Sequence, residues 1–199
     1  NWAKGPKKDE PCVYSSNILK ARAYEDEFLL FKTLIVLSVT KLETSPPSWW
    51  TSLTKFEEIK ELLSDDIKKI TGLVIDPYFS STKIRWILDN IPDGQKRAEN
   101  GELLFGTVDS WIIWNISSEK NHYIDSTNAS RTMLMNIHDL EWDDYLLKTF
   151  NIPLNILPKI KPSIGEFGVT AKNIFTKEIP ITGVAGDQSA SLYGQACFE

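Results

Sequence analysis

The stretch 179–195, a short apolar run that leads through a glycine-marked turn into a helix, constrains the fold more than any other part of this chain. Residues Ile179 to Val184 are mostly apolar and β-branched, which predicts a buried strand. Asp187 opens the segment after the turn, and that segment is expected to be helical. A strand that delivers a carboxylate beside a helix N-terminus is a common way for α/β folds to build an active site. The stretch therefore favours an α/β domain with a site at this junction.

Asp187 has two interpretations at this stage. An aspartate at a helix start caps the helix, because its carboxylate accepts hydrogen bonds from the free amides of the first turn. The alternative is that Asp187 is a carboxylate of an active site. Local pattern alone leaves both interpretations open.

Composition and charge exclude several classes of partner. The chain has 199 residues, which is room for one substantial domain, and its formal net charge is −5. That charge argues against nucleic acid or an anionic membrane as a partner reached through bulk electrostatics. Cys12 and Cys197 lie at opposite ends and form no disulfide framework and no zinc-binding spacing, so a reducing, cytoplasmic setting is expected.

No targeting or membrane-spanning segment is predicted. The first ten residues are polar and charged, without the apolar core of a signal peptide. The most apolar stretch, Phe28 to Val39, is too short to span a bilayer and contains Lys32, so a buried strand or helix is expected there. Because the chain begins at Asn1 and stops at Glu199 directly after a helix, we expect a fragment of a longer protein.

Helices, strands and loops alternate along the chain in the manner of an α/β domain. Apolar residues at helical spacing predict a helix from Phe56 to Ile70, which Gly72 ends in the left-handed cap position. A second helix is predicted from Asp143 to Phe150. The segment 127–132 is expected to be a polar loop.

Hydroxyl and carboxyl side chains are expected to cap two further helices. Ser80, Ser81 or Thr82 is predicted to cap a helix that runs from about Lys83 to Asn90. Asp109 or Ser110 is predicted to cap a short helix that carries Trp111.

Tyr78 stands just ahead of the first of these two caps. A tyrosine beside a helix start can present a hydroxyl and a ring face to a small polyol. The alternative is that Tyr78 packs in the core, and the pattern does not decide between the two.

Four segments together point to a known family. They are Gly72–Lys83, Gly101–Trp111, Thr127–Met133 and Gly183–Gln188, in this order along the chain. From about Thr71 onward the chain resembles the FGGY carbohydrate kinases, and in particular the members that phosphorylate glycerol. Residues Tyr78 to Asn90 also fit the first sequence signature of the family.

The resemblance implies a fold and a domain organisation. FGGY kinases have an actin-like, ribonuclease-H-like ATPase fold of two domains, with the active site between them. Residues 56–199 look like the later part of the N-terminal domain, so a partial α/β domain of this type is expected. Residues 1–55 align with nothing in the family and are treated as an unassigned extension or a mispredicted segment.

The resemblance also implies the chemistry and its residues. ATP and Mg would serve the transfer of a phosphoryl group to glycerol, with Asp187 as the general base. Tyr78 would line the glycerol pocket, and Asp187 and Gln188 would each bind a glycerol hydroxyl. Asp187 is also a candidate to contact Mg through water. The family's ATP-binding motifs lie outside this chain. A homo-oligomer of the full-length parent is compatible with the resemblance.

Two alternatives remain at this stage. The first keeps the enzyme class and changes the substrate to another polyol or sugar. The second is a non-catalytic truncated product that acts as an interaction module. The feature that supports this second alternative is the absence of the family's phosphate-binding hairpin from this sequence. Because both this hairpin and the nucleotide-closing second domain of the family are absent from the sequence, the 199-residue chain by itself is expected to be inactive.

Overall fold

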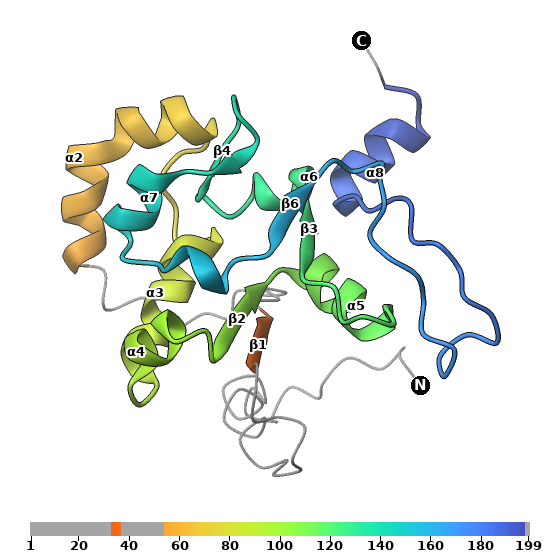
Figure 1. Cartoon of the computed structure of the whole chain (residues 1–199). Coiled ribbons are helices and arrows are strands. Elements are labelled where there is room, and N and C mark those ends of the chain that lie inside the picture. Colours follow the sequence, from red (N-terminus) through yellow and green to blue (C-terminus); the bar gives the residue numbers. More distant parts are fainter. Residues whose placement is uncertain (1–32, 37–53, 198–199) are drawn as a thin grey trace, which may run out of the picture.

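The computed structural model of the chain describes residues 33–36 and 54–197 (Figure 1). The helices are α2 (Thr54–Thr71), α3 (Ser80–Asn90), α4 (Gly94–Glu99), α5 (Val108–Ile116), α6 (Ser126–Ala129), α7 (Asp144–Thr149), α8 (Asp187–Gly194) and the 3-10 helix η3 (Leu154–Ile156). The strands are β1 (Thr33–Val36), β2 (Leu103–Gly106), β3 (Tyr123–Asp125), β4 (Met135–Asn136), β5 (Glu141–Trp142) and β6 (Lys159–Lys161).

Parallel strand pairs confirm the α/β class. Strand β1 pairs with β2 in parallel, with Thr33 opposite Leu103, and β3 pairs with β6 in parallel, with Tyr123 opposite Lys159. Parallel neighbours require a crossover connection, which helices supply in α/β folds. The remaining pair, β4 with β5, is antiparallel.

The predicted apolar stretch from Phe28 to Val39 is a strand where the structure describes it. Residues Thr33–Val36 form β1, and the other residues of the stretch lie outside the described part of the chain. Most of residues 1–55, the segment treated as unassigned, also lies outside the described part of the chain.

The main hydrophobic core lies among α2, α3, α4, β2, α7 and η3, which gather on the left in Figure 1. Phe105 of β2 and Ile67 of α2 are fully buried in it. Other buried residues of this core come from the surrounding elements, among them Ile84, Leu88, Ala98, Leu103, Leu146, Leu147 and Ile156. In contrast, α8 lies on the other side of β3 and β6 and has no buried residue.

The predicted helix from Phe56 to Ile70 is confirmed as α2, which runs from Thr54 to Thr71. Gly72 ends it with φ 70°, and its amide donates to the Lys68 carbonyl at 2.9 Å. Glycine enters this left-handed conformation without the steric cost of a Cβ atom. Helix α7 likewise confirms the prediction for Asp143 to Phe150, with Asp143 as its N-cap.

The predicted caps of α3 and α5 are wrong. The extended residue ahead of α3 is Phe79, so Ser80 and Ser81 are the first residues of the helix and make no capping hydrogen bond. The N-cap of α5 is Thr107, also without a side-chain capping bond, and Asp109 lies inside the helix. In both cases the helix begins one to three residues earlier than the predicted capping residues would place its start.

The predicted buried strand from Ile179 to Val184 is also wrong. In the described residues this segment makes only isolated bridges, Pro180 with Val169 and Gly183 with Ile164. Ile179 and its neighbour across the bridges, Ile164, are exposed, and Ile181 and Val184 are only half-buried. The segment is apolar in composition, but among the described residues it is neither a regular strand nor buried.

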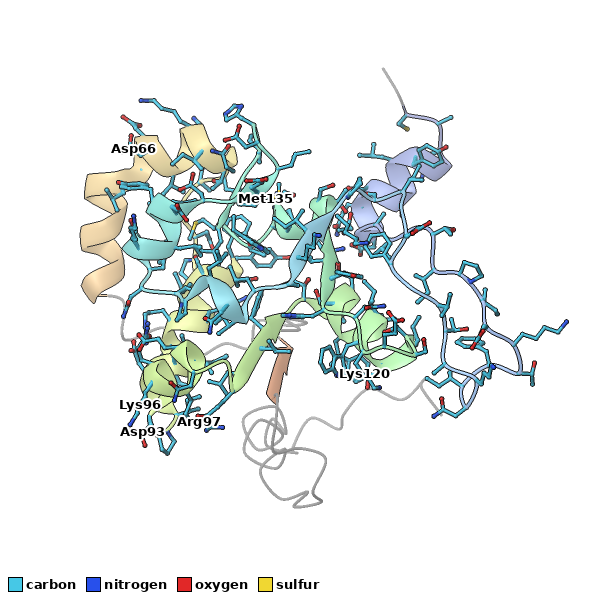
Figure 2. The ribbon with its side chains drawn as sticks, in the orientation of Figure 1. Asp66, Asp93, Lys96, Arg97, Lys120 and Met135 are labelled. Carbon is cyan, nitrogen blue, oxygen red and sulfur yellow. The ribbon has the colours of Figure 1, made fainter. Side chains whose placement is uncertain are left out.

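Figure 2 shows which of the labelled side chains point into solvent and which lie inside the fold. Asp66 on α2 and Asp93, Lys96 and Arg97 at the start of α4 point away from the ribbon, whereas Met135 lies within it and is buried against Ile124 and Ala129. None of the described helices is both long and apolar enough to cross a membrane.

Candidate functional site

Asp187 is the first residue of α8, which rules out the interpretation that it caps this helix. The N-cap is Gly186, with φ −61° and ψ 149°, and no side chain caps the helix. Asp187 is exposed, and within the described residues its carboxylate makes no hydrogen bond and no ion pair. The carboxylate is therefore free to accept a hydrogen bond from a ligand.

Asp187 lines a cavity of about 580 Å³ between α5, α6 and the segment that precedes α8. The polar side chains of the lining are Asp109, Asn128 and Asp187. The rest of the lining is Val108, Ile112, Ile113, Ile116, Ile181, Gly183, Val184, Ala185 and Gly186. A mostly apolar cavity with a few polar groups is typical of a small-molecule site.

Asp109 is a second carboxyl group of this cavity, and pattern reasoning assigned it only a capping role. Its side chain is buried and accepts hydrogen bonds from the Thr107 hydroxyl and, at 3.1 Å, from the Asp125 amide. Burial raises the pKa of Asp109, since a charged carboxylate is poorly solvated there, and these hydrogen bonds oppose the rise. The charge of Asp125 also raises it.

Asp125 is fully buried and is the centre of a hydrogen-bond network next to the cavity. It caps α6, a one-turn helix in the segment that was expected to be a polar loop. Its Oδ1 atom accepts from the amide and the side-chain nitrogen of Asn128, and its Oδ2 atom accepts from the amide and hydroxyl of Thr127. The Ser163 hydroxyl also donates to Oδ2, at 2.7 Å.

Two contacts extend this network to the turn that precedes Asp187. The Gly186 amide donates to the Thr127 hydroxyl oxygen at 2.8 Å, and the Val184 amide donates to the Ser163 carbonyl at 2.9 Å. Because these partners are far apart in sequence, no local pattern predicts the contacts.

Tyr78 lies in the turn ahead of α3, and its side chain is 57% exposed. The exposed ring contradicts the core-packing alternative. The Lys83 ammonium lies 5.3 Å from the ring centroid and donates to the Tyr78 carbonyl at 2.5 Å. The Tyr78 amide donates to Asp76 at 2.7 Å, so backbone contacts hold this turn while the ring faces solvent.

The structure brings only some of the predicted site residues together. Gln188 follows Asp187 on α8 and is exposed. Neither Tyr78 nor Gln188 is a lining residue of the cavity that Asp187 shares with Asp109. The cavity therefore joins Asp187 to Asp109 and Asn128, two residues that pattern reasoning did not place in a site.

A model of the FGGY family of carbohydrate kinases, N-terminal domain, matches residues 49–194 of the chain. The chain is 58% identical over 138 residues to the glycerol kinase of Treponema denticola, an alignment that covers 69% of this chain and 28% of that protein. It is 56% identical over 144 residues to glycerol kinase 2 of Thermotoga maritima, covering 72% of this chain and 29% of that protein. The chain thus spans less than a third of the length of these relatives.

Solved structures show the same relationship. The crystal structure of Plasmodium falciparum glycerol kinase with ADP matches with a TM-score of 0.70 and 36% identity, over 77% of this chain and 30% of that one. A ligand-bound xylulose kinase from Lactobacillus acidophilus matches with a TM-score of 0.61 and 20% identity, over 72% of this chain and 29% of that one, which shows the fold alone. The likeness confirms the expected fold class, part of an actin-like, ribonuclease-H-like ATPase domain.

Proposed function

The chain belongs to the FGGY family of carbohydrate kinases, and from that premise we propose that its parent protein is a glycerol kinase, which transfers the γ-phosphoryl group of ATP to glycerol. The observation that carries the proposal is the identity of more than half of the aligned residues with proteins named glycerol kinase. In this proposal residues 56–199 are the later part of the N-terminal domain, and residues 1–55 stay unassigned.

Asp187 is the general base in this proposal. An alcohol is a poor nucleophile, so a carboxylate within hydrogen-bond reach orients the hydroxyl and accepts its proton as the glycerol oxygen bonds to the γ-phosphorus. The bond from that phosphorus to the bridging oxygen breaks at the same time, and ADP leaves. The Asp187 carboxylate is exposed and has no hydrogen-bond partner among the described residues, which supports this role. A substrate alcohol can therefore bind to it without displacing a group of the protein.

Tyr78 and Gln188 bind glycerol in the same proposal. The exposed ring of Tyr78 offers an apolar face to the glycerol carbons, and the Gln188 amide offers both a donor and an acceptor to a hydroxyl. Tyr78 does not line the cavity that contains Asp187, so its place in the glycerol site rests on the family resemblance.

ATP and Mg are the nucleotide and the metal of the proposed reaction. The described residues contain no cluster of three or more His, Cys, Asp or Glu side chains that could hold a metal ion. Magnesium keeps most of its waters and binds through one or two carboxylates together with substrate phosphates, so the unpaired Asp187 fits a contact through water. When bound, Mg would neutralise charge on the phosphates.

Cytoplasmic location and the absence of a nucleic-acid partner are part of the proposal. The net charge of −5 supports the second point, and the two cysteines without a disulfide framework support the first. A homo-oligomer of the parent also remains a proposal.

The test uses the complete enzyme, by which we mean the parent protein or a chimera that carries the matched segment of this chain in a full-length relative. Asp187→Asn should lower kcat for glycerol by roughly a hundredfold to ten-thousandfold, the usual contribution of a positioned base. The free energy of unfolding should change by less than about 1 kcal/mol, since no capping bond is lost and only a charge near the helix dipole disappears.

The matched control is Asp144→Asn, because Asp144 is the exposed first residue of α7 as Asp187 is of α8. It should leave kcat unchanged. Near-normal turnover in Asp187→Asn would remove Asp187 as the base. A panel of other polyols and sugars tests the substrate, and a preference for one of them over glycerol would overturn that part of the proposal.

A further inference from the structure

A fully buried carboxylate, Asp125, is connected by two hydrogen-bonded routes to the turn that carries Asp187. We propose that Asp125 and Thr127 are positioning residues for Asp187: they hold the turn 184–186 so that the Asp187 carboxylate meets the substrate hydroxyl in one fixed place. This inference rests on the proposed function of Asp187 and adds residues whose side chains do not themselves touch the substrate.

The first route runs through the Thr127 hydroxyl, and chemistry dictates its direction. The Gly186 amide can only donate, so the hydroxyl oxygen accepts from it at 2.8 Å. The hydroxyl hydrogen is then used toward Asp125 Oδ2, at 2.7 Å. Thr127 therefore needs both functions of a hydroxyl group, and a side chain of the same shape without a hydroxyl would break both bonds.

The second route runs through Ser163. Its hydroxyl donates to the same Oδ2 atom at 2.7 Å, and its carbonyl accepts from the Val184 amide at 2.9 Å. The two routes thus attach residues 184 and 186 to one buried group. A carboxylate that accepts several hydrogen bonds in a buried setting holds its partners more firmly than neutral acceptors do.

Asp187 needs such external support. Helix α8 has no buried residue, so core packing does not fix its place, and the Asp187 carboxylate itself has no partner among the described residues. The turn that joins α8 to the rest of the chain is consequently what sets the position of the carboxylate. A misplacement of about 1 Å in a catalytic group can cost about a hundredfold in rate.

The decisive variants are Thr127→Val and Thr127→Ser. Valine keeps the shape and removes both hydrogen bonds, whereas serine keeps the hydroxyl. In the complete enzyme, Thr127→Val should lower kcat for glycerol roughly tenfold to a hundredfold and change KM less, and Thr127→Ser should restore most of kcat. In the same proteins, hydrogen exchange of the Gly186 amide should be roughly fivefold or more faster in Thr127→Val and close to wild type in Thr127→Ser.

Thr132→Val is the matched control. Thr132 is buried in the turn that follows α6, and its hydroxyl donates to the Ala129 carbonyl and accepts from the Leu134 amide. If Thr132→Val lowers kcat per folded molecule as much as Thr127→Val does, the effect is a general loss of local structure and the proposal is overturned. It is also overturned if Thr127→Val leaves kcat or Gly186 exchange unchanged.

Failure of the positioning role and failure of the proposed function give different results. If the unsubstituted complete enzyme forms no glycerol 3-phosphate, the proposed function is wrong and the positioning role falls with it. If the enzyme is active and Thr127→Val retains its turnover, only the positioning role is wrong.

Discussion

Lys83 makes the stability of this chain depend on pH in a way that can be measured directly. It lies on α3 with its side chain only 8% exposed, and its ammonium group donates to the Tyr78 carbonyl. Burial lowers the pKa of Lys83 from 10.5 to about 8, because the charged form loses solvation, and the negative charge of Asp76 partly opposes this. Between pH 8 and the ordinary lysine pKa, the unfolded chain therefore binds a proton that the folded chain does not.

The sign follows from proton linkage. Where the unfolded state binds more protons, the free energy of unfolding rises with pH, so Lys83 disfavours folding below about pH 8 and disfavours it less as the pH rises from there. One pKa unit corresponds to about 1.4 kcal/mol, so the gain between pH 7 and 9.5 should approach about 2 kcal/mol. Lys83→Met removes this titration and keeps an unbranched apolar stem.

The assay is denaturant unfolding of the 199-residue chain and of Lys83→Met at several pH values between 7 and 9.5. The difference in unfolding free energy, variant minus wild type, should fall by about 2 kcal/mol across this range. Its absolute value at pH 7 also contains the lost hydrogen bond to Tyr78, so only the change with pH tests the reasoning. Lys96→Met is the matched control for the loss of a lysine, because Lys96 is exposed and points into solvent (Figure 2). A Lys83→Met difference that stays constant or grows with pH would refute the argument.

Three further predictions concern stability. Burial raises the pKa of Asp109, so the folded chain holds this proton more tightly than the unfolded chain, and the resulting stabilisation is lost as the pH rises above about 4. In Asp109→Asn, the free energy of unfolding from denaturant titrations between pH 4 and 7 should no longer contain this decrease. Phe105→Ala should lower the free energy of unfolding by about 3–5 kcal/mol, because the ring is fully buried in the main core, and a loss below about 1 kcal/mol would contradict this packing. Gly72→Ala should cost about 1–2 kcal/mol, since φ is 70° and a Cβ atom would lie 3.2 Å from the Ile137 Cδ1 atom; an unchanged thermal midpoint would show that the turn can relax.

Local patterns in the sequence determined the helices that depend on near neighbours. Helix α2 follows from apolar residues at helical spacing, and its end follows from Gly72, because helix periodicity and a left-handed cap involve residues only a few positions apart. The family and the fold class also followed from the sequence, since four segments in the right order carry the resemblance. The assignments of Tyr78, Asp187 and Gln188 to a glycerol site came from the same source and stay predictions.

Only the tertiary structure decided how the neighbourhood of Asp187 is built. The apolar run 179–184 looked like a buried strand, but burial depends on how other elements cover it, and among the described residues the run is half-buried or exposed. Gly186, not Asp187, occupies the cap position of α8, a difference of one residue that backbone angles decide and composition does not. The contact between Thr127 and Gly186 joins residues 59 positions apart, and the role of Asp125 depends on it. Such contacts arise when distant segments pack together, so a pattern that extends over a few residues contains no record of them.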